Sequence, residues 1–338
     1  MAQKPKTHLI ITSIADSDNS VLQGYAKESA SHQVEFIVVG DKKSPASFNL
    51  PGCDFYSADR QEGLDFNIIK LLPYNHYARK NIGYIAAIAD NSEIIVETDD
   101  DNLPLPEFWS EKTRMTSAHH MVDSGWLNVY RYFSELPIWP RGFSLEHIQQ
   151  EVPAVGGMEV VDCPIQQGLA TQNPDVDAIY RLTLPLPVEF EKADSIALGK
   201  NSFCPFNSQN TIWFKDAFPL LYLPSYCSFR MTDIWRSFIA QRVAWECNWN
   251  ILFPQSTVWQ ERNDHNLLQD FKDEVPGYLH NNAIFIELGK LKLASGSEHI
   301  AENTYSCYEK LVDMGLVGSS ELPLLKAWFA DLSSLGIC

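Results

Sequence analysis

Long apolar runs are missing from this chain. The run Leu9–Ile11 after Lys4 and Lys6 is too short for a secretory signal peptide, and no apolar stretch approaches the roughly 18 residues of a membrane helix. The seven cysteines are odd in number, scattered and free of any CxxC pair, which is typical of reduced thiols in a cytosolic protein. We therefore expect a cytoplasmic protein without an integral membrane segment.

Positive charge is also scarce. The chain has 26 Lys plus Arg against 43 Asp plus Glu, a net charge of −17, which argues against non-specific binding to nucleic acid or to anionic lipid. An acidic protein that handles an anionic substrate must concentrate its few cations locally. Repeats and low-complexity tracts are absent too, and 338 residues suffice for one large domain or for a main domain with an appendage.

The first hundred residues alternate between strands and helices. Buried strands are expected at 9–14 and 34–39, with a helix between them that has Asp18 as a candidate N-cap. A helical pattern over 76–89 leads directly to the β-rich run Ile94–Val96. This alternation predicts an α/β fold with parallel strands.

Three consecutive carboxylates, Asp99 to Asp101, follow the run Ile94–Val96. At about 5 Å and an effective dielectric of about 20, each ionised pair repels by roughly 3 kcal/mol, and a bound cation would reverse this repulsion. Oxygen ligands of this kind suit Mg²⁺ or Mn²⁺ rather than zinc. The alternative is a solvated acidic turn, but ligands of open α/β sheets bind outside the carboxyl ends of strands, which favours a metal site.

Other charged residues lie close to predicted strand ends. Arg79 and Lys80, one connection before the acidic cluster, suit a diphosphate, and the alternative is an exposed first helical turn. Asp41 ends the second strand, where it either accepts a hydrogen bond from a base or ribose or starts a turn. Both interpretations stay open for each of these residues.

The middle of the chain is rich in aromatic residues and proline. Arg141 stands within Trp139–Phe143, and aromatic faces with interleaved arginine suit sugar rings and phosphates, although most aromatic residues belong to the core. Asp233 stands at the start of a predicted helix, where it is either a catalytic carboxylate or, like Thr232, a cap.

The run Phe203–Thr211 contains many short hydrogen-bonding side chains, among them Asn207 and Gln209. Later in the chain, three amphipathic segments succeed one another. We therefore expect a main domain over 1–275 and a helical appendage over 276–338.

These motifs together resemble the STELLO-type glycosyltransferase-like domain over about residues 8–270. The motifs that carry the resemblance are Val39–Lys43, Tyr74–His76, Arg79–Tyr84, Thr98–Asn102, Asn128–Tyr130, Trp139–Phe143 and Pro205–Thr211. More distantly, Arg141–Ser144 and Gly168–Ala178 are similar to the reversibly glycosylated polypeptides, which are UDP-arabinopyranose mutases. Both groups imply a GT-A fold, a Rossmann-like mixed sheet flanked by helices.

The resemblance also implies roles for individual residues. A DxD-type acidic cluster of this fold holds Mn²⁺ or Mg²⁺ on the diphosphate of a nucleotide sugar, and here Asp99 and Asp101 are the implied ligands, Asp101 the most direct. His265 is a second candidate ligand, the alternative being a surface histidine in a polar loop. The residues implied in nucleotide-sugar binding are Asp41, Lys42, Asn75, Arg79, Lys80, Asp99, Asp100, Asn207 and Gln209.

The implied activity is metal-dependent transfer of a glycosyl group from a nucleotide diphosphate sugar to a glycan or other hydroxyl acceptor, as in polysaccharide biosynthesis. A UDP-sugar is the expected donor, and Arg141 is expected to contact it. An inverting enzyme also needs a base near the acceptor hydroxyl, for which Asp233 is the first candidate. The alternatives are a mutase-like or self-glycosylating reaction at Arg141 and a non-catalytic assembly partner, which would have no use for the acidic cluster.

Overall fold

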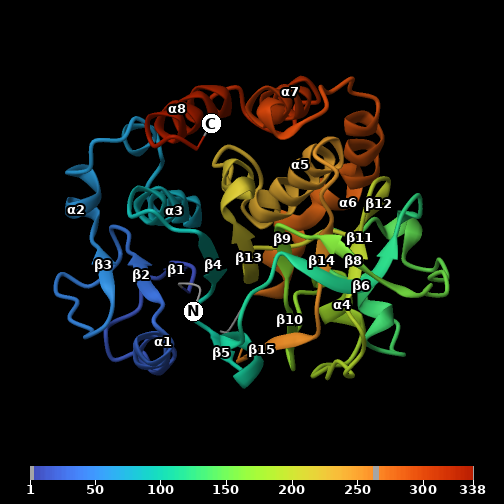
Figure 1. Ribbon diagram of the computed structural model, residues 1–338, viewed down its shortest axis with the longest axis horizontal. Coiled ribbons are helices and arrows are strands. Elements are labelled where there is room, and N and C mark those ends of the chain that lie inside the picture. Colours follow the sequence, from blue (N-terminus) through green and yellow to red (C-terminus); the bar gives the residue numbers. More distant parts are fainter. Residues whose placement is uncertain (1–3, 262–265, 338) are drawn as a thin grey trace.

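The computed structural model describes residues 4–261 and 266–337. Its centre is a ten-stranded mixed sheet with the strand order β3-β2-β1-β4-β13-β9-β14-β11-β6-β8 (Figure 1). In that order the strands are Asp54–Tyr56, Glu35–Val39, Thr7–Thr12, Ile94–Thr98, Asn210–Phe214, Ile165–Gln167, Ile251–Phe253, Ile196–Leu198, Met115–Met121 and Met158–Asp162. The predicted α/β class with a mixed sheet is confirmed.

Strands β1 to β4 form one parallel part of the sheet. Helix α1 (Ser20–His32) packs on one face, where it meets Leu9 of β1, and helix α3 (Lys80–Ala89) packs on the other, where it meets Ile10. The consecutive apolar residues of β1 are buried because both faces of this part of the sheet are covered. A Cβ on Gly83 of α3 would lie 2.6 Å from Ile10 Cγ2, so glycine allows the close contact of helix and sheet.

Several local predictions differ from the structure in detail. The N-cap of α1 is Asn19 and not Asp18. The side chain of Asn19 accepts a hydrogen bond from the backbone of Leu22 at 3.0 Å. The helical pattern over 76–89 is divided into a 3₁₀ turn, Tyr77–Arg79, and helix α3. Between β3 and α3 lies the short helix α2 (Ala58–Glu62).

The order of the strands reverses between β1 and β4. Strands β2 and β3 lie on one side of β1, and strand β4 lies on its other side. The carboxyl ends of β1 and β4 therefore form a topological switch point. β13 continues the sheet antiparallel to β4. Two small sheets, β10-β15-β5 and β12-β7, lie beside the main one. Their strands are Leu169–Thr171, Ser256–Gln260, Asn102–Pro104, Ser202–Phe203 and Gly125–Trp126.

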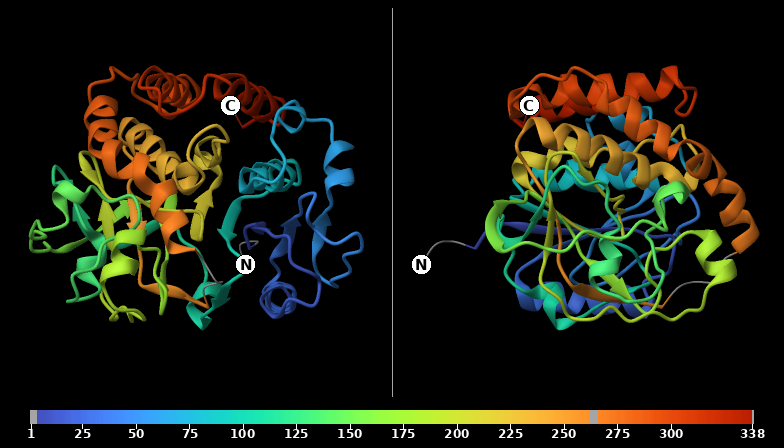
Figure 2. Two further views of the ribbon diagram at one scale, coloured as in Figure 1. Left: turned by 180° about the vertical axis from the view of Figure 1, so that it is seen from behind. Right: turned by 90° about the vertical axis from the view of Figure 1, so that its right-hand side faces the viewer.

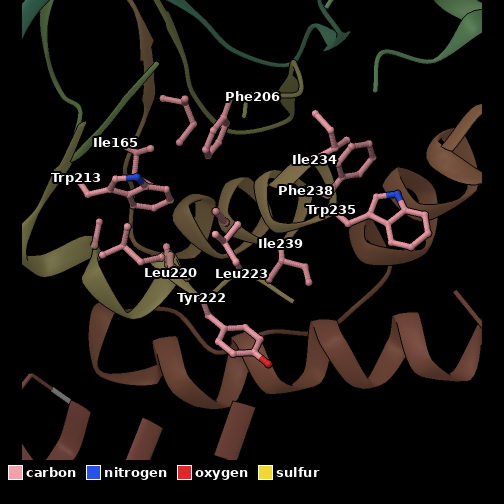
Figure 3. Close-up of a cluster of buried hydrophobic side chains, with 14 of the residues drawn as sticks. Ile165, Phe206, Trp213, Leu220, Tyr222, Leu223, Ile234, Trp235, Phe238 and Ile239 are labelled. Carbon is pink, nitrogen blue, oxygen red and sulfur yellow. The ribbon is translucent and has the colours of Figure 1, made fainter. Parts of the chain in front are cut away.

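The helices of the second half are joined to the sheet by a common core. They are α4 (Ala178–Thr183), α5 (Thr232–Glu246), α6 (Leu267–Gly289), α7 (Ile300–Asp313) and α8 (Glu321–Ser334). Helix α7 packs against α5, and α8 packs against α7 and against the 3₁₀ turn Ile68–Lys70, so the two helices form the outer layer on this side of the molecule (Figures 1 and 2). In the core shown in Figure 3, the ring of Tyr222 lies 5.5 Å from that of Tyr308 in α7 and 6.0 Å from that of Trp328 in α8.

The predicted boundary after residue 275 falls inside α6, which is one continuous helix. Polar contacts add to the shared core: Glu321 of α8 accepts hydrogen bonds from the backbone N–H groups of Ser225 and Tyr226 at 2.9 and 2.7 Å. Helices are present at the C-terminal end as predicted, and their treatment as a separate domain stays a prediction. Within 4–261 and 266–337, the helices are all too short or too polar to cross a lipid bilayer.

Candidate functional site

Two adjoining cavities open at the carboxyl ends of β1, β2 and β4. The Asp41 cavity, of about 290 Å³, lies beside Asp41 and His76. The Asp233 cavity, of about 250 Å³, is bordered by Asp99–Asp101, Arg141 and Asp233. The residues that line both cavities are Thr12, Tyr77, Asp100 and Phe229. The two cavities therefore form one bipartite cleft at the switch point of the sheet, where α/β proteins bind ligands.

Asp99, the first carboxylate of the acidic cluster, is held by a buried ammonium group. Lys80 Nζ lies 3.0 Å from Asp99 Oδ1 and also donates to the carbonyl oxygens of Thr98 and Ser208, at 3.1 and 3.3 Å. Desolvation, together with the neighbouring carboxylates, raises the pKa of Asp99 to about 6, although Lys80 acts in the opposite direction. Lys80 uses its three N–H groups inside the protein, and its predicted contact with a diphosphate stays a prediction that this geometry does not favour.

The other two carboxylates of the cluster have separate partners. Ser13 Oγ donates a hydrogen bond to Asp100, and Gln260 Nε2 donates one to Asp101 Oδ2 at 3.2 Å. Gln260 reaches Asp101 because the antiparallel pairing of β15 with β5 places Gln260 opposite Asn102. Each acidic side chain is thus held by a different element of the fold.

The fit of a divalent cation depends on these oxygen atoms. Within residues 4–261 and 266–337, no three His, Cys, Asp or Glu side chains gather closely enough to hold a metal ion. Mg²⁺ is nevertheless commonly bound by one or two carboxylates, waters and substrate phosphates, and Asp101 with Asp99 fits that donor set. His265, the other predicted ligand, lies outside the described residues.

Arg141 is the centre of a buried ion-pair cluster. Its Nε lies 2.8 Å from Asp175 Oδ1, and its Nη2 lies 2.9 Å from Asp175 Oδ2 and 3.0 Å from Asp233 Oδ2. Its Nη1 donates to Asp233 Oδ1 at 3.1 Å and to the carbonyl oxygen of Arg230. The guanidinium group is therefore fully hydrogen-bonded, and the predicted contact of Arg141 with the donor stays a prediction.

Asp233 receives hydrogen bonds from other groups as well. Tyr77 Oη donates to Asp233 Oδ1 at 3.1 Å, and the backbone of Ser208 donates to Asp233 Oδ2 at 3.1 Å. Burial alone would raise the pKa of Asp233, but the charge and hydrogen bonds of Arg141 outweigh it and hold the pKa well below its ordinary value. The N-cap of α5 is Met231, so Asp233 is not the N-cap residue itself, but its Oδ1 accepts a hydrogen bond from the backbone of Ile234 in the first turn at 3.0 Å.

The Asp41 cavity contains several predicted binding residues. Asp41 Oδ2 accepts a hydrogen bond from the backbone of His76 at 3.1 Å, which holds the carboxylate at the cavity wall. Asn75 also lines the cavity and adopts a positive φ of 56°. Lys42 does not line the cavity, and its Nζ lies 3.9 Å from the centre of the Tyr74 ring. These positions are compatible with recognition of a base or ribose, which stays a prediction.

Three other predicted residues are buried in hydrogen-bond networks. Arg79 Nε donates to Gln61 Oε1 at 2.8 Å, so this side chain supports the wall of the Asp41 cavity. Asn207 Nδ2 donates to Asp175 Oδ2 at 2.7 Å, and its Oδ1 accepts from the backbone of Gln209. Asn207 and Gln209 are 5% and 6% exposed, and neither lines either cavity. Their predicted roles in donor binding are untested.

Residues that no motif singled out also border the cleft. Tyr77 and Phe229 stand where the two cavities meet, with ring centroids 4.9 Å apart, and Arg230 lines the Asp233 cavity. Their only signal in the sequence was proximity to predicted site residues, Asn75 and Arg79 for Tyr77 and Asp233 for Phe229 and Arg230.

The parallel strands β1, β2 and β4, the antiparallel strand β13 beside them and the acidic cluster after β4 define a GT-A-type fold, as predicted. Within this class the chain is similar to the STELLO glycosyltransferases, whose family model matches residues 230–338. The similarity predicted from the sequence is therefore confirmed. Its extent is corrected, because the match includes helices α6 to α8, whereas the resemblance was expected to end near residue 270.

Two curated relatives from Arabidopsis thaliana agree with the family match. The chain is 27% identical over 352 residues to "Probable glycosyltransferase STELLO2", an alignment that covers 97% of this chain and 45% of that protein. It is 27% identical over 335 residues to "Probable glycosyltransferase STELLO1", covering 89% of this chain and 41% of that protein. The chain thus spans less than half the length of these relatives. The distant likeness to the reversibly glycosylated polypeptides stays a prediction.

Solved structures are similar at a lower level. One is glucosyl-3-phosphoglycerate synthase from Mycobacterium tuberculosis, in complex with Mn²⁺, UDP and glucosyl-3-phosphoglycerate. Its sequence is 10% identical, the TM-score is 0.40, and the alignment covers 82% of this chain and 80% of that chain. Mannosyl-3-phosphoglycerate synthase from Rubrobacter xylanophilus is 10% identical with a TM-score of 0.37 and covers 85% and 76%. At these TM-scores the likeness assigns neither a residue nor a ligand to this chain.

Proposed function

We propose that this chain is a metal-dependent glycosyltransferase that transfers a sugar from a nucleotide diphosphate sugar, with a UDP-sugar as the first candidate, to a hydroxyl acceptor. The observation that supports this most is the bipartite cleft, in which the Asp41 cavity adjoins the Asp233 cavity beside Asp99–Asp101. The curated relatives named as probable glycosyltransferases agree with the proposal.

The two cavities would divide the donor between them. The nucleoside occupies the Asp41 cavity, where the carboxylate of Asp41 can accept from a base or ribose, and the sugar occupies the Asp233 cavity. The diphosphate then lies where the cavities meet, near Asp100. Mn²⁺ or Mg²⁺ bound by Asp101 and Asp99 would neutralise the charge of the leaving diphosphate. Lys80 keeps Asp99 in position for this task.

The contacts of Asp233 support an orienting role rather than that of a general base. A base needs an available oxygen and a pKa near the working pH, whereas both oxygens of Asp233 accept hydrogen bonds from Arg141 and its pKa is lowered. For the same reason the geometry does not favour a glycosylated Arg141, because the guanidinium nitrogens of Arg141 are engaged with Asp175, Asp233 and the backbone.

A screen of nucleotide sugars for hydrolysis tests the proposed function. The chain is incubated with UDP-, GDP- and CMP-sugars in the presence of Mn²⁺, and release of the free nucleotide is measured. We expect release from at least one UDP-sugar, loss of this release with EDTA, and loss in the Asp101→Ala variant. If no nucleotide sugar is turned over or bound, the alternative of a non-catalytic assembly partner replaces the proposal.

A further inference from the structure

Two arginines border the Asp233 cavity, and their hydrogen bonds differ. The nitrogens of Arg141 are all engaged with Asp175, Asp233 and a carbonyl oxygen. Arg230 donates through Nε and Nη2 to one carboxylate oxygen, Glu274 Oε1, at 3.0 and 2.9 Å. Its Nη1 has no hydrogen-bond partner in the part of the chain that the structure describes. Arg230 thus keeps N–H groups available at the cavity.

The position of Arg230 is determined from two sides. Arg230 belongs to the 3₁₀ turn Phe229–Met231, directly before α5, and its backbone carbonyl oxygen accepts a hydrogen bond from Arg141. Its side chain is anchored by the fully buried Glu274 of α6 and is 15% exposed. One edge of the guanidinium fork is therefore fixed, and little side-chain entropy remains to be lost when the other edge binds a ligand.

The cations predicted to bind a diphosphate are occupied elsewhere. Lys80 donates to Asp99 and to two carbonyl oxygens, and the Nε and Nη2 of Arg79 donate to Gln61. Asp99–Asp101 make part of the lining of the Asp233 cavity acidic, so an anion bound there needs positively charged donors among the other lining residues.

We propose that the available N–H groups of Arg230 bind the diphosphate of the nucleotide-sugar donor from the Asp233 cavity, next to Phe229, which lines both cavities. A planar guanidinium group suits this ligand, because it presents paired N–H donors to phosphate oxygens. The inference rests on the proposed function and deepens it, since it assigns donor binding to a residue that is held in place by helix α6. It also gives the helices after residue 266 a part in the site.

The test compares Arg230→Ala with Arg131→Ala, a control at an exposed arginine that lines neither cavity. Binding of UDP, inorganic pyrophosphate and uridine is measured by calorimetry or ligand-observed NMR, each with Mn²⁺. We expect Arg230→Ala to weaken UDP and pyrophosphate by about 10- to 100-fold, the range for hydrogen bonds to charged groups, and to leave uridine unchanged. Arg131→Ala binds all three ligands as the wild type does.

The assignment is overturned if Arg230→Ala binds UDP as tightly as the wild type does. It is also overturned if the variant loses the same factor of affinity for UDP and for uridine, because that result indicates a distorted cleft. If Arg230→Ala does not fold, Arg230→Lys replaces it: this variant keeps the charge but not the fork and must still bind UDP more weakly than the wild type. A wild-type chain that binds neither UDP nor pyrophosphate refutes the proposed function itself, and the inference with it.

Discussion

Glu97 and Arg236 form a buried ion pair in which Arg236 Nη2 lies 2.6 Å from Glu97 Oε1. Both side chains are at most 1% exposed, and Trp213 Nε1 donates a further hydrogen bond to Glu97 at 2.9 Å. Glu97 stands on β4 shortly before Asp99, and Arg236 stands in α5 shortly after Asp233. The ion pair therefore joins two elements at the Asp233 cavity, because Asp99–Asp101 follow β4 and Asp233 belongs to α5.

Loss of this ion pair should destabilise the fold strongly. In Glu97→Gln the charge of Arg236 stays buried without its partner, which typically costs about 3–5 kcal/mol, so the urea midpoint should fall clearly. The control is Glu287→Gln, which removes a surface pair with Lys290 and should leave the midpoint where it is. Equal midpoints for both variants would show that the buried pair adds no more than the surface pair.

Removal of Arg141 should produce a pH-dependent instability. In the wild type, Arg141 lowers the pKa of Asp175 and of Asp233, although burial acts in the opposite direction. The ionised carboxylates therefore stabilise the folded protein above a pH of about 3.9, the ordinary pKa of Asp. This stabilisation is lost as the pH falls through the lowered pKa values of the folded state. Without the arginine, burial raises both pKa values, and ionisation then opposes folding as the pH rises.

The difference in unfolding free energy between wild type and Arg141→Gln should therefore grow from pH 4 to pH 7 and reach about 3–5 kcal/mol. Urea unfolding at a series of pH values measures it. A difference that stays constant over this range would mean that the two carboxylates do not respond to Arg141.

Asp233 should influence turnover without acting as a titrating base. Its lowered pKa keeps it ionised between about pH 5 and 8, so the pH–rate profile of donor hydrolysis should contain no inflection from this group. Asp233→Asn should keep the shape of that profile and lose less than the roughly 10²- to 10⁴-fold typical of a general base. A loss within that range, with a changed acidic limb, would restore Asp233 as the base.

The position of the acidic cluster could be predicted because it depends on a local pattern. A short apolar run followed at once by carboxylates marks the end of a buried strand, and β4 indeed ends at Thr98, directly before Asp99. The alternation of strands and helices likewise predicted β1, β2 and their parallel arrangement. The antiparallel insertion of β13 beside β4 could not be predicted, because a pairing between segments so far apart leaves no local trace.

The partners of the predicted cations depend on tertiary contacts. A sequence shows that Arg141 and Lys80 carry charge, but not that Asp175 and Thr98 lie within hydrogen-bond distance of them. These side chains were therefore predicted to bind a ligand, and the hydrogen bonds that they make inside the protein could not be predicted. Arg230, by contrast, acquires its place at the cavity from Glu274 in α6, which no spacing indicates.

The central claim is that the cleft binds a nucleoside diphosphate together with a divalent cation. Cation and diphosphate should each strengthen the binding of the other, because the coupling between two bound ligands is reciprocal. Replacement of Asp101 by Ala should abolish the effect of the metal, since a hard cation loses a charged oxygen ligand.

The most direct measurement is a calorimetric titration of UDP into the wild type and into Asp101→Ala, each with Mn²⁺ and with EDTA, and with GDP and CMP for comparison. The account predicts tight UDP binding by the wild type only when Mn²⁺ is present, and no effect of Mn²⁺ on the variant. Equal UDP affinity of the wild type with Mn²⁺ and with EDTA would contradict the account and leave Asp99–Asp101 as a solvated acidic turn.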